Sequence, residues 1–175
     1  MRKSRSQRAS RANGDSAEAE FKAACDYYAV TGRAKLFKRP TQFRVIQRGA
    51  VGLAAVPTVK AGVDYAGALA GGRAVLVEVK SRSAARVAVT ALQPNQWAEL
   101  AEFDGIGALC LVVVRLELRT GAAWWAIPFA AWAMEAEAAK MAGRASFNEA
   151  TLDRIGYRCP LRQPYDRPDW LGVLD

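Results

Sequence analysis

The stretch VDYAGALAGGRAVLVEVK, residues 63–80, decides the fold that this sequence predicts. Its second half is apolar as far as Glu78, and because successive strand residues point to opposite faces, Glu78 and Lys80 lie on the same face. The glycine turn near Gly71 favours an antiparallel hairpin whose first strand contains Asp64. Antiparallel pairing then brings Asp64 close to Glu78.

Two carboxylates at one sheet edge repel each other, so this arrangement indicates a divalent cation between them. Oxygen-only ligation favours Mg²⁺ or Mn²⁺. A metal held by Asp64 and Glu78 could polarise a phosphate and lower the pKa of a bound water, which Lys80 could orient. The competing interpretation is a strand-surface ion pair between Glu78 and Lys80, which the bare E-x-K pattern favours by itself. The preceding aspartate and the apolar strand favour the metal site.

The absence of histidine excludes whole classes of function. Without imidazole there is neither a histidine-based zinc site nor a histidine-based catalytic triad. The three cysteines, Cys25, Cys110 and Cys159, are an odd number in or near apolar runs, so no disulfide framework is expected and a reducing cytoplasm is the simplest location. No long uncharged apolar stretch predicts a membrane span, and the basic N-terminus does not resemble a secretory signal.

Basic charge is concentrated in two parts of the chain. The net charge is +8, and residues 1–13 hold five Lys or Arg residues and no acid. The segment between Asp26 and Asp64 also lacks acidic residues and carries seven more basic ones. Such a surface favours a polyanionic partner, above all nucleic acid, although a solubility tail with an ordinary cationic face has the same composition.

Periodicity and turn residues predict a mixed sheet with helices on its faces, in one α/β domain over residues 14–175 that follows a flexible basic arm over residues 1–13. One capping box places a helix start at Asp15, and a second pairs Ser146 with Glu149. Helices are expected from Asp15 to Gly32, from Pro94 to Gly105 and over residues 129–142, and strands over 34–39, 41–48, 62–69, 73–81, 108–116, 122–128 and 169–175.

The segment 47–61, QRGAVGLAAVPTVKA, fits neither a regular helix nor a central strand, because it is apolar yet carries two glycines and Pro57. An exposed projection, a partner-binding segment and a plain buried loop are all compatible with this composition.

The order Asp64-Tyr65, Gly67, Gly72-Arg73, Glu78 and Lys80 resembles the D-x(n)-E-x-K core of the PD-(D/E)XK nuclease superfamily, and more narrowly the RecU-type Holliday junction resolvases of bacteria and their phages. The resemblance extends along the chain. It covers ANGDSAE at 12–18 with Glu18, FKRPTQFRV at 37–45, LQPNQWAEL at 92–100 with Gln96, and the stalk position at 47–61. Asn95 stands where this family usually has histidine.

The resemblance implies a restriction-endonuclease-like core with a projecting stalk, and a homodimer that makes paired nicks in four-way DNA junctions. It implies that Asp64, Glu78 and the Val79 carbonyl bind Mg²⁺ (Mn²⁺ possible) with help from Glu18, and that Lys80 and Gln96 serve catalysis. Basic and polar residues implied to contact DNA are Lys38, Arg39, Thr41, Arg44, Arg48, Lys60 and Arg73. Two alternatives remain at this point: another nuclease of the superfamily acting on flaps or duplexes, and a non-catalytic junction-binding protein.

Overall fold

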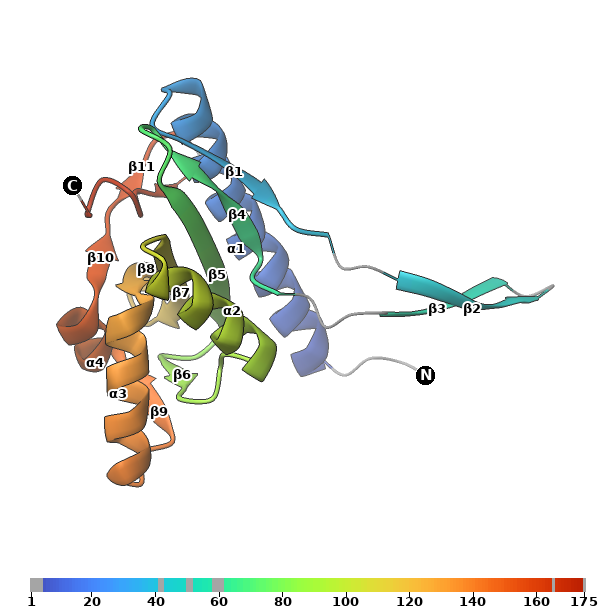
Figure 1. Ribbon diagram of the computed structural model, residues 1–175. Helices are drawn as coiled ribbons and strands as arrows, with labels where there is room; N and C mark the ends of the chain where they lie inside the picture. Colours follow the sequence, from blue (N-terminus) through green and yellow to red (C-terminus); the bar gives the residue numbers. More distant parts are fainter. Residues whose placement is uncertain (1–4, 41–42, 50–51, 58–61, 165, 175) are drawn as a thin grey trace.

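A six-stranded mixed sheet forms the centre of the computed structural model (Figure 1). The structure describes the backbone of residues 5–40, 43–49, 52–57, 62–164 and 166–174, and the side chains of 14–40, 62–164 and 166–174. Along the sheet the strand order is β1 (Ala34–Lys38), β4 (Tyr65–Leu69), β5 (Ala74–Arg82), β7 (Leu109–Leu118), β8 (Gly121–Pro128) and β10 (Tyr157–Cys159). Only the β5–β7 pair of this sheet is parallel.

The parallel pair requires a crossover, which α2 (Pro94–Gly105) provides between β5 and β7. Helix α1 (Arg5–Val30) covers the opposite face of the sheet. Helices α3 (Phe129–Met141) and α4 (Glu149–Ile155) join α2 on its face. The mixed sheet with helices on both faces confirms the fold expected from the sequence.

Two apolar clusters fill the layers on either side of the sheet. On β7, Val112 and Val114 belong to the cluster under α2 and α3, whereas Leu111 and Val113 belong to the cluster under α1. All four are completely buried, as the continuous apolar run of this strand predicts for a strand covered on both faces. β5 is therefore held between packed layers, and this fixes the strand that carries Glu78 and Lys80.

The hairpin of β4 and β5 forms as expected. Tyr65 pairs with Val77 and Ala68 with Ala74. Gly71 and Gly72 both have φ of +88°, a left-handed conformation that suits glycine in a tight turn. On the other side of β4, a Cβ added to Gly67 would lie 1.9 Å from the Lys35 carbonyl oxygen, so only glycine allows β1 to lie this close.

Strands β2 (Phe43–Gly49) and β3 (Gly52–Pro57) form a separate antiparallel hairpin that extends away from the sheet (Figure 1). The described parts of segment 47–61, residues 47–49 in β2 and 52–57 in β3, belong to this hairpin, as the interpretation as a projection expects. Residues 50–51 and 58–61 lie outside the described residues. The segment is also more regular than expected, because it contains β3. Pro57 lies at the end of that strand, where a missing N–H disturbs the pairing least.

Three boundary predictions are wrong. Helix α1 begins by Arg5, ten residues before Asp15, so the segment from Arg5 to Asn13 is helical and not an irregular arm. The N-cap of α4 is Asn148, whose side chain accepts the Thr151 N–H at 3.0 Å, and not Ser146. The C-terminal segment over 169–174 forms turns and no strand.

Small elements missing from the sequence-based prediction complete the fold: the strand pairs β6 (Arg86–Ala88) with β9 (Ser146–Asn148) and β11 (Leu161–Arg162) with β12 (Arg167–Pro168), and the edge strand β10. The three cysteines are buried and free. Among the described helices, none is both long and apolar enough to span a membrane.

Candidate active site

Asp64 and Glu78 meet at the rim of the sheet, just beyond the point where the β4–β5 ladder ends at Tyr65 and Val77. The Asp64 N–H donates to Glu78 Oε2 at 3.1 Å, and the Val79 N–H donates to Asp64 Oδ2 at 3.0 Å. The aspartate side chain thus takes the place of a missing ladder partner. The two carboxylates lie together as the hairpin argument requires.

Lys80 and Gln96 complete a compact polar group around Glu78. Lys80 Nζ donates to Glu78 Oε1 at 2.6 Å and to Gln96 Oε1 at 3.0 Å, and Gln96 Nε2 donates to Glu78 Oε1 at 2.7 Å. Gln96 lies in the first turn of α2, where its Oε1 also accepts the Gln93 N–H at 3.0 Å. Each of the three side chains is therefore fixed by the other two.

Burial makes both carboxyl groups weaker acids than usual. Glu78 is only 2% exposed, and its burial together with the charge of Asp64 raises its pKa to about 7. Burial also raises the pKa of Asp64, against the opposing effects of the Val79 N–H and the Lys80 charge. A like-charge pair in a partly desolvated position is what a bound cation would stabilise.

The donor chemistry of this rim fits a hard divalent cation. Asp64 and Glu78 offer carboxylate oxygens, and the carbonyl of Val79 points to the same strand edge as its N–H, toward Asp64. Among the residues with described side chains, no three Asp, Glu or Cys groups gather into one metal-binding cluster. One or two carboxylates are the usual protein share of a Mg²⁺ shell that also contains waters and substrate phosphate.

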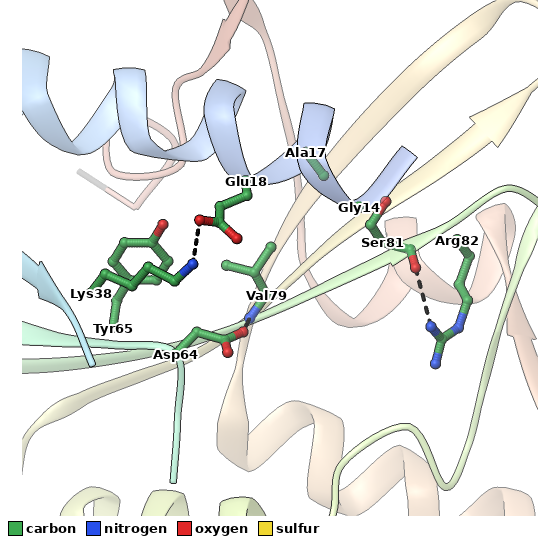
Figure 2. A pocket seen from close by; sticks show the side chains of 9 residues that line it. All are labelled: Gly14, Ala17, Glu18, Lys38, Asp64, Tyr65, Val79, Ser81 and Arg82. Atoms are coloured by element: carbon green, nitrogen blue, oxygen red, sulfur yellow. Dashed lines mark hydrogen bonds and ion pairs between the residues drawn. The ribbon is translucent and has the colours of Figure 1, made fainter. Parts of the chain in front are cut away.

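A hollow of about 300 Å³ opens beside Asp64 and Val79 on the α1 side (Figure 2). Glu18 projects into it from α1, and its carboxylate is paired with the Lys38 ammonium. Glu18 thus lies near the carboxylate pair, with its charge engaged by Lys38. The full lining is Gly14, Ala17, Glu18, Lys38, Asp64, Tyr65, Val79, Ser81 and Arg82.

The residues expected to contact DNA are spread over several environments. Lys38 reaches the hollow, whereas the Arg39 guanidinium is paired with Glu99 on α2. Arg73 donates to the carbonyls of Gly107 and Ala108 at the turn end of the hairpin, away from Asp64. Arg44 and Arg48 lie on the projecting β2, where the structure describes backbone alone, and Thr41 and Lys60 lie outside the described residues.

Sequence reasoning missed several residues that shape this region. Ser81 and Arg82 line the hollow, and the only signal for them was their position directly after the E-x-K triplet. Glu20 accepts from Trp124 Nε1 at 3.0 Å and from Arg115 Nε at 3.3 Å, which fastens α1 to the sheet beside Glu18. This contact joins residues far apart in the sequence, so no local pattern indicated it.

This chain matches a protein family and solved structures. No curated protein matches the chain in sequence. Among solved structures, one similar fold is Hjc of Archaeoglobus fulgidus, described as a Holliday junction resolvase from an archaeal hyperthermophile. The likeness has 17% identity and a TM-score of 0.45 over 80% of this chain and 94% of that one. The model of the RecU family, described as Recombination protein U, matches residues 12–166, and the chain therefore belongs to the RecU family.

Proposed function

We propose that this protein is a Holliday junction resolvase, a metal-dependent endonuclease that makes paired nicks in four-way DNA junctions by phosphodiester hydrolysis. The observation that carries the proposal is the convergence of Asp64, Glu78, Lys80 and Gln96 at one rim of the sheet. Membership of the RecU family supports the choice of recombination DNA as substrate.

Asp64, Glu78 and the Val79 carbonyl would hold Mg²⁺, or Mn²⁺ in its place, with Glu18 at the margin of the site. When bound there, the ion would supply Lewis acidity toward a phosphate oxygen and acidify a water molecule. The raised pKa of Glu78 supports this role, because a cation would restore the charged form that burial disfavours.

Lys80 would orient the attacking water. An ammonium group has three N–H donors, and the bonds to Glu78 and Gln96 use two of them. The third remains for a water or a phosphate oxygen entering the site. Gln96 holds Lys80 and Glu78 in this arrangement, so its contribution to the reaction is through their position.

Basic residues around the site and along the projection would hold the DNA by its phosphates. Lys38 at the hollow and Arg44 and Arg48 on β2 are the first candidates. Thr41 and Lys60, which lie outside the described residues, are further candidates from the sequence. Such contacts position the substrate without reading bases, so junction selection would depend on shape. Symmetric nicking needs two active sites, and a twofold homodimer is the commonest way to supply them.

The test is cleavage of a synthetic four-way junction beside a linear duplex and a flap of the same sequence. We expect Mg²⁺-dependent paired nicks in the junction, no cutting in EDTA, and no cutting by Asp64→Asn or Glu78→Gln. Preference for the flap or the duplex would favour another nuclease activity. Junction binding without metal-dependent cutting would favour a non-catalytic binding protein, and wild-type rates in both variants would show that the site is elsewhere.

A further inference from the structure

Glu99 on α2 binds both chain segments that lead to the projecting β2–β3 hairpin. Its carboxylate pairs with the Arg39 guanidinium on the segment that leaves β1. Its Oε2 accepts the Val63 N–H at 2.9 Å on the segment that returns to β4. The two segments are also joined to each other, since the Arg39 N–H donates to the Asp64 carbonyl oxygen at 2.8 Å. The partly buried carboxylate of Glu99 thus binds both chain segments that flank the hairpin.

Gly62 shows how closely this contact is fitted. A Cβ at Gly62 would lie 2.0 Å from Glu99 Oε2 and 3.0 Å from an Arg39 guanidinium nitrogen. The first distance is too short for a real Cβ and the second is tight, so a side chain at position 62 would push the Glu99 carboxylate away from Val63. In the arrangement seen here, the Glu99 carboxylate occupies the space that a side chain at position 62 would need.

The contact ends one residue before the candidate metal-binding aspartate. Val63 is buried, and its N–H is fixed by Glu99, while the Asp64 N–H and side chain are engaged with Glu78 and Val79. The β4–β5 ladder begins only at Tyr65, so these side-chain bonds, together with the bond from the Arg39 N–H to the Asp64 carbonyl oxygen, align the backbone at residues 63 and 64. A substitution at Glu99 would therefore alter the position of the Asp64 backbone and side chain.

We infer that Glu99 is a positioning residue of the active site, which aligns Asp64 with Glu78 and connects the projecting hairpin to the metal-binding carboxylates. The inference rests on the proposed function for its catalytic consequence, whereas its structural part concerns the metal site alone. The inference also gives Arg39 a structural role: its ion pair with Glu99 holds the segment that leaves β1.

The decisive variants are Glu99→Ala and Gly62→Ala, with Glu102→Gln as the matched control on an exposed position of the same helix. The first readout is the Mg²⁺ or Mn²⁺ concentration that gives half of the maximal thermal stabilisation, measured without DNA. The second is the single-turnover cleavage rate of a four-way junction at saturating enzyme and Mg²⁺. The third is junction affinity in EDTA.

We expect both variants to raise the metal midpoint about tenfold, the size typical of a partner that orients a metal ligand, and to lower the cleavage rate by a similar factor. Junction affinity should stay within about threefold, because the contacts of Glu99 are with Arg39 and Val63 of the protein itself. Glu99→Gln should lie between the wild type and Glu99→Ala, since an amide has an acceptor at only one of the two oxygen positions that Arg39 and Val63 use. Glu102→Gln should match the wild type.

A wild-type metal midpoint in folded Glu99→Ala and Gly62→Ala would overturn the inference, as would an equal shift in Glu102→Gln. If Glu99→Ala does not fold, Glu99→Gln and Gly62→Ala decide by the same readouts. Failure of the wild type to cut any DNA would refute the proposed function but not the positioning role, which the metal midpoint tests separately.

Discussion

Asp64→Asn should make the metal-free protein more stable at alkaline pH while abolishing its activity. Asparagine has the size of aspartate and can still accept the Val79 N–H, but it removes one charge from the buried carboxylate pair. The charge of Asp64 is, after burial itself, the main reason why the pKa of Glu78 is raised to about 7. Removing that charge lowers the cost of ionising Glu78 in the folded state.

The size of the stability change follows from the raised pKa of Glu78. The pKa of Glu78 rises from 4.5 to about 7 on folding, which corresponds to about 3 kcal/mol at 1.36 kcal/mol per unit. Since folding raises this pKa, the contribution of Glu78 is fully present below about pH 4.5 and is lost as the pH rises through about 7. If the share due to Asp64 is about 1 kcal/mol, the variant gains roughly 2–4 °C in Tm at pH 8.

This chain is well suited to the measurement because it has no histidine. Glu135 and Asp169, whose pKa values are lowered by their ion pairs and hydrogen bonds, titrate below the window between pH 5 and pH 8. The assay is thermal unfolding in EDTA over that window for the wild type, Asp64→Asn and the exposed control Asp15→Asn. The wild-type Tm should fall toward pH 8, and Mg²⁺ should reverse part of the fall.

Two results would refute this reasoning. A Tm of the wild type that does not change between pH 5 and pH 8 would mean that Glu78 has an ordinary pKa. A lower Tm of Asp64→Asn than of the wild type at pH 8 would mean that the aspartate charge stabilises the fold, as it would in a simple ion pair with Lys80.

Three further outcomes are expected. Lys80→Ala should lower the single-turnover rate of junction cleavage by about 10²–10⁴-fold, because it removes the group that orients the water. Circular dichroism should show an intact fold, and a rate within a factor of two of the wild type would contradict this role. Gly67→Ala should destabilise the protein by about 3 kcal/mol in urea unfolding, because its Cβ would meet the β1 backbone, and an unchanged midpoint would show that β1 moves away freely. Arg115→Ala should cost about 3 kcal/mol in the same assay by leaving the Glu20 carboxylate without its buried cation, whereas a loss below about 0.5 kcal/mol would mean that Trp124 alone holds Glu20.

The sequence predicts those parts of the fold whose signals are local. The β4–β5 hairpin follows from its glycine turn, and β7 follows from an uninterrupted apolar run that suits a strand covered on both faces. The capping box at Asp15 misleads because capping residues also occur inside helices. The preceding segment is rich in alanine and arginine, which favour the helix, and so α1 continues back to Arg5.

The C-terminal segment shows how distant contacts decide local structure. The apolar pattern around Trp170 and Leu171 resembles a strand, but both residues are buried against α1. The Leu171 N–H donates to Tyr28 Oη at 3.2 Å, and Tyr28 Oη donates to Asp169 Oδ1 at 2.5 Å. The Tyr28 hydroxyl and the Asp169 carboxylate thus accept the N–H groups of Leu171 and Gly172 in place of a ladder. Tyr28 lies more than a hundred residues away from Leu171, so the pattern alone could not indicate it.

The same distinction applies to the site. Asp64, Glu78 and Lys80 could be placed together because one hairpin carries all three, whereas Glu99 reaches Arg39 and Val63 from another element. The difference between the predictable and the unpredictable site residues has a physical origin at the end of the β4–β5 ladder. β5 remains paired with β7 as far as Arg82, while its pairing with β4 stops at Val77, so Glu78 and Val79 lie on a strand held from one side only. The open edge of β5 exposes main-chain groups that Asp64 and a cation can share. The long-range contacts of Glu99 hold the backbone before β4 in place, as a continued ladder would otherwise do.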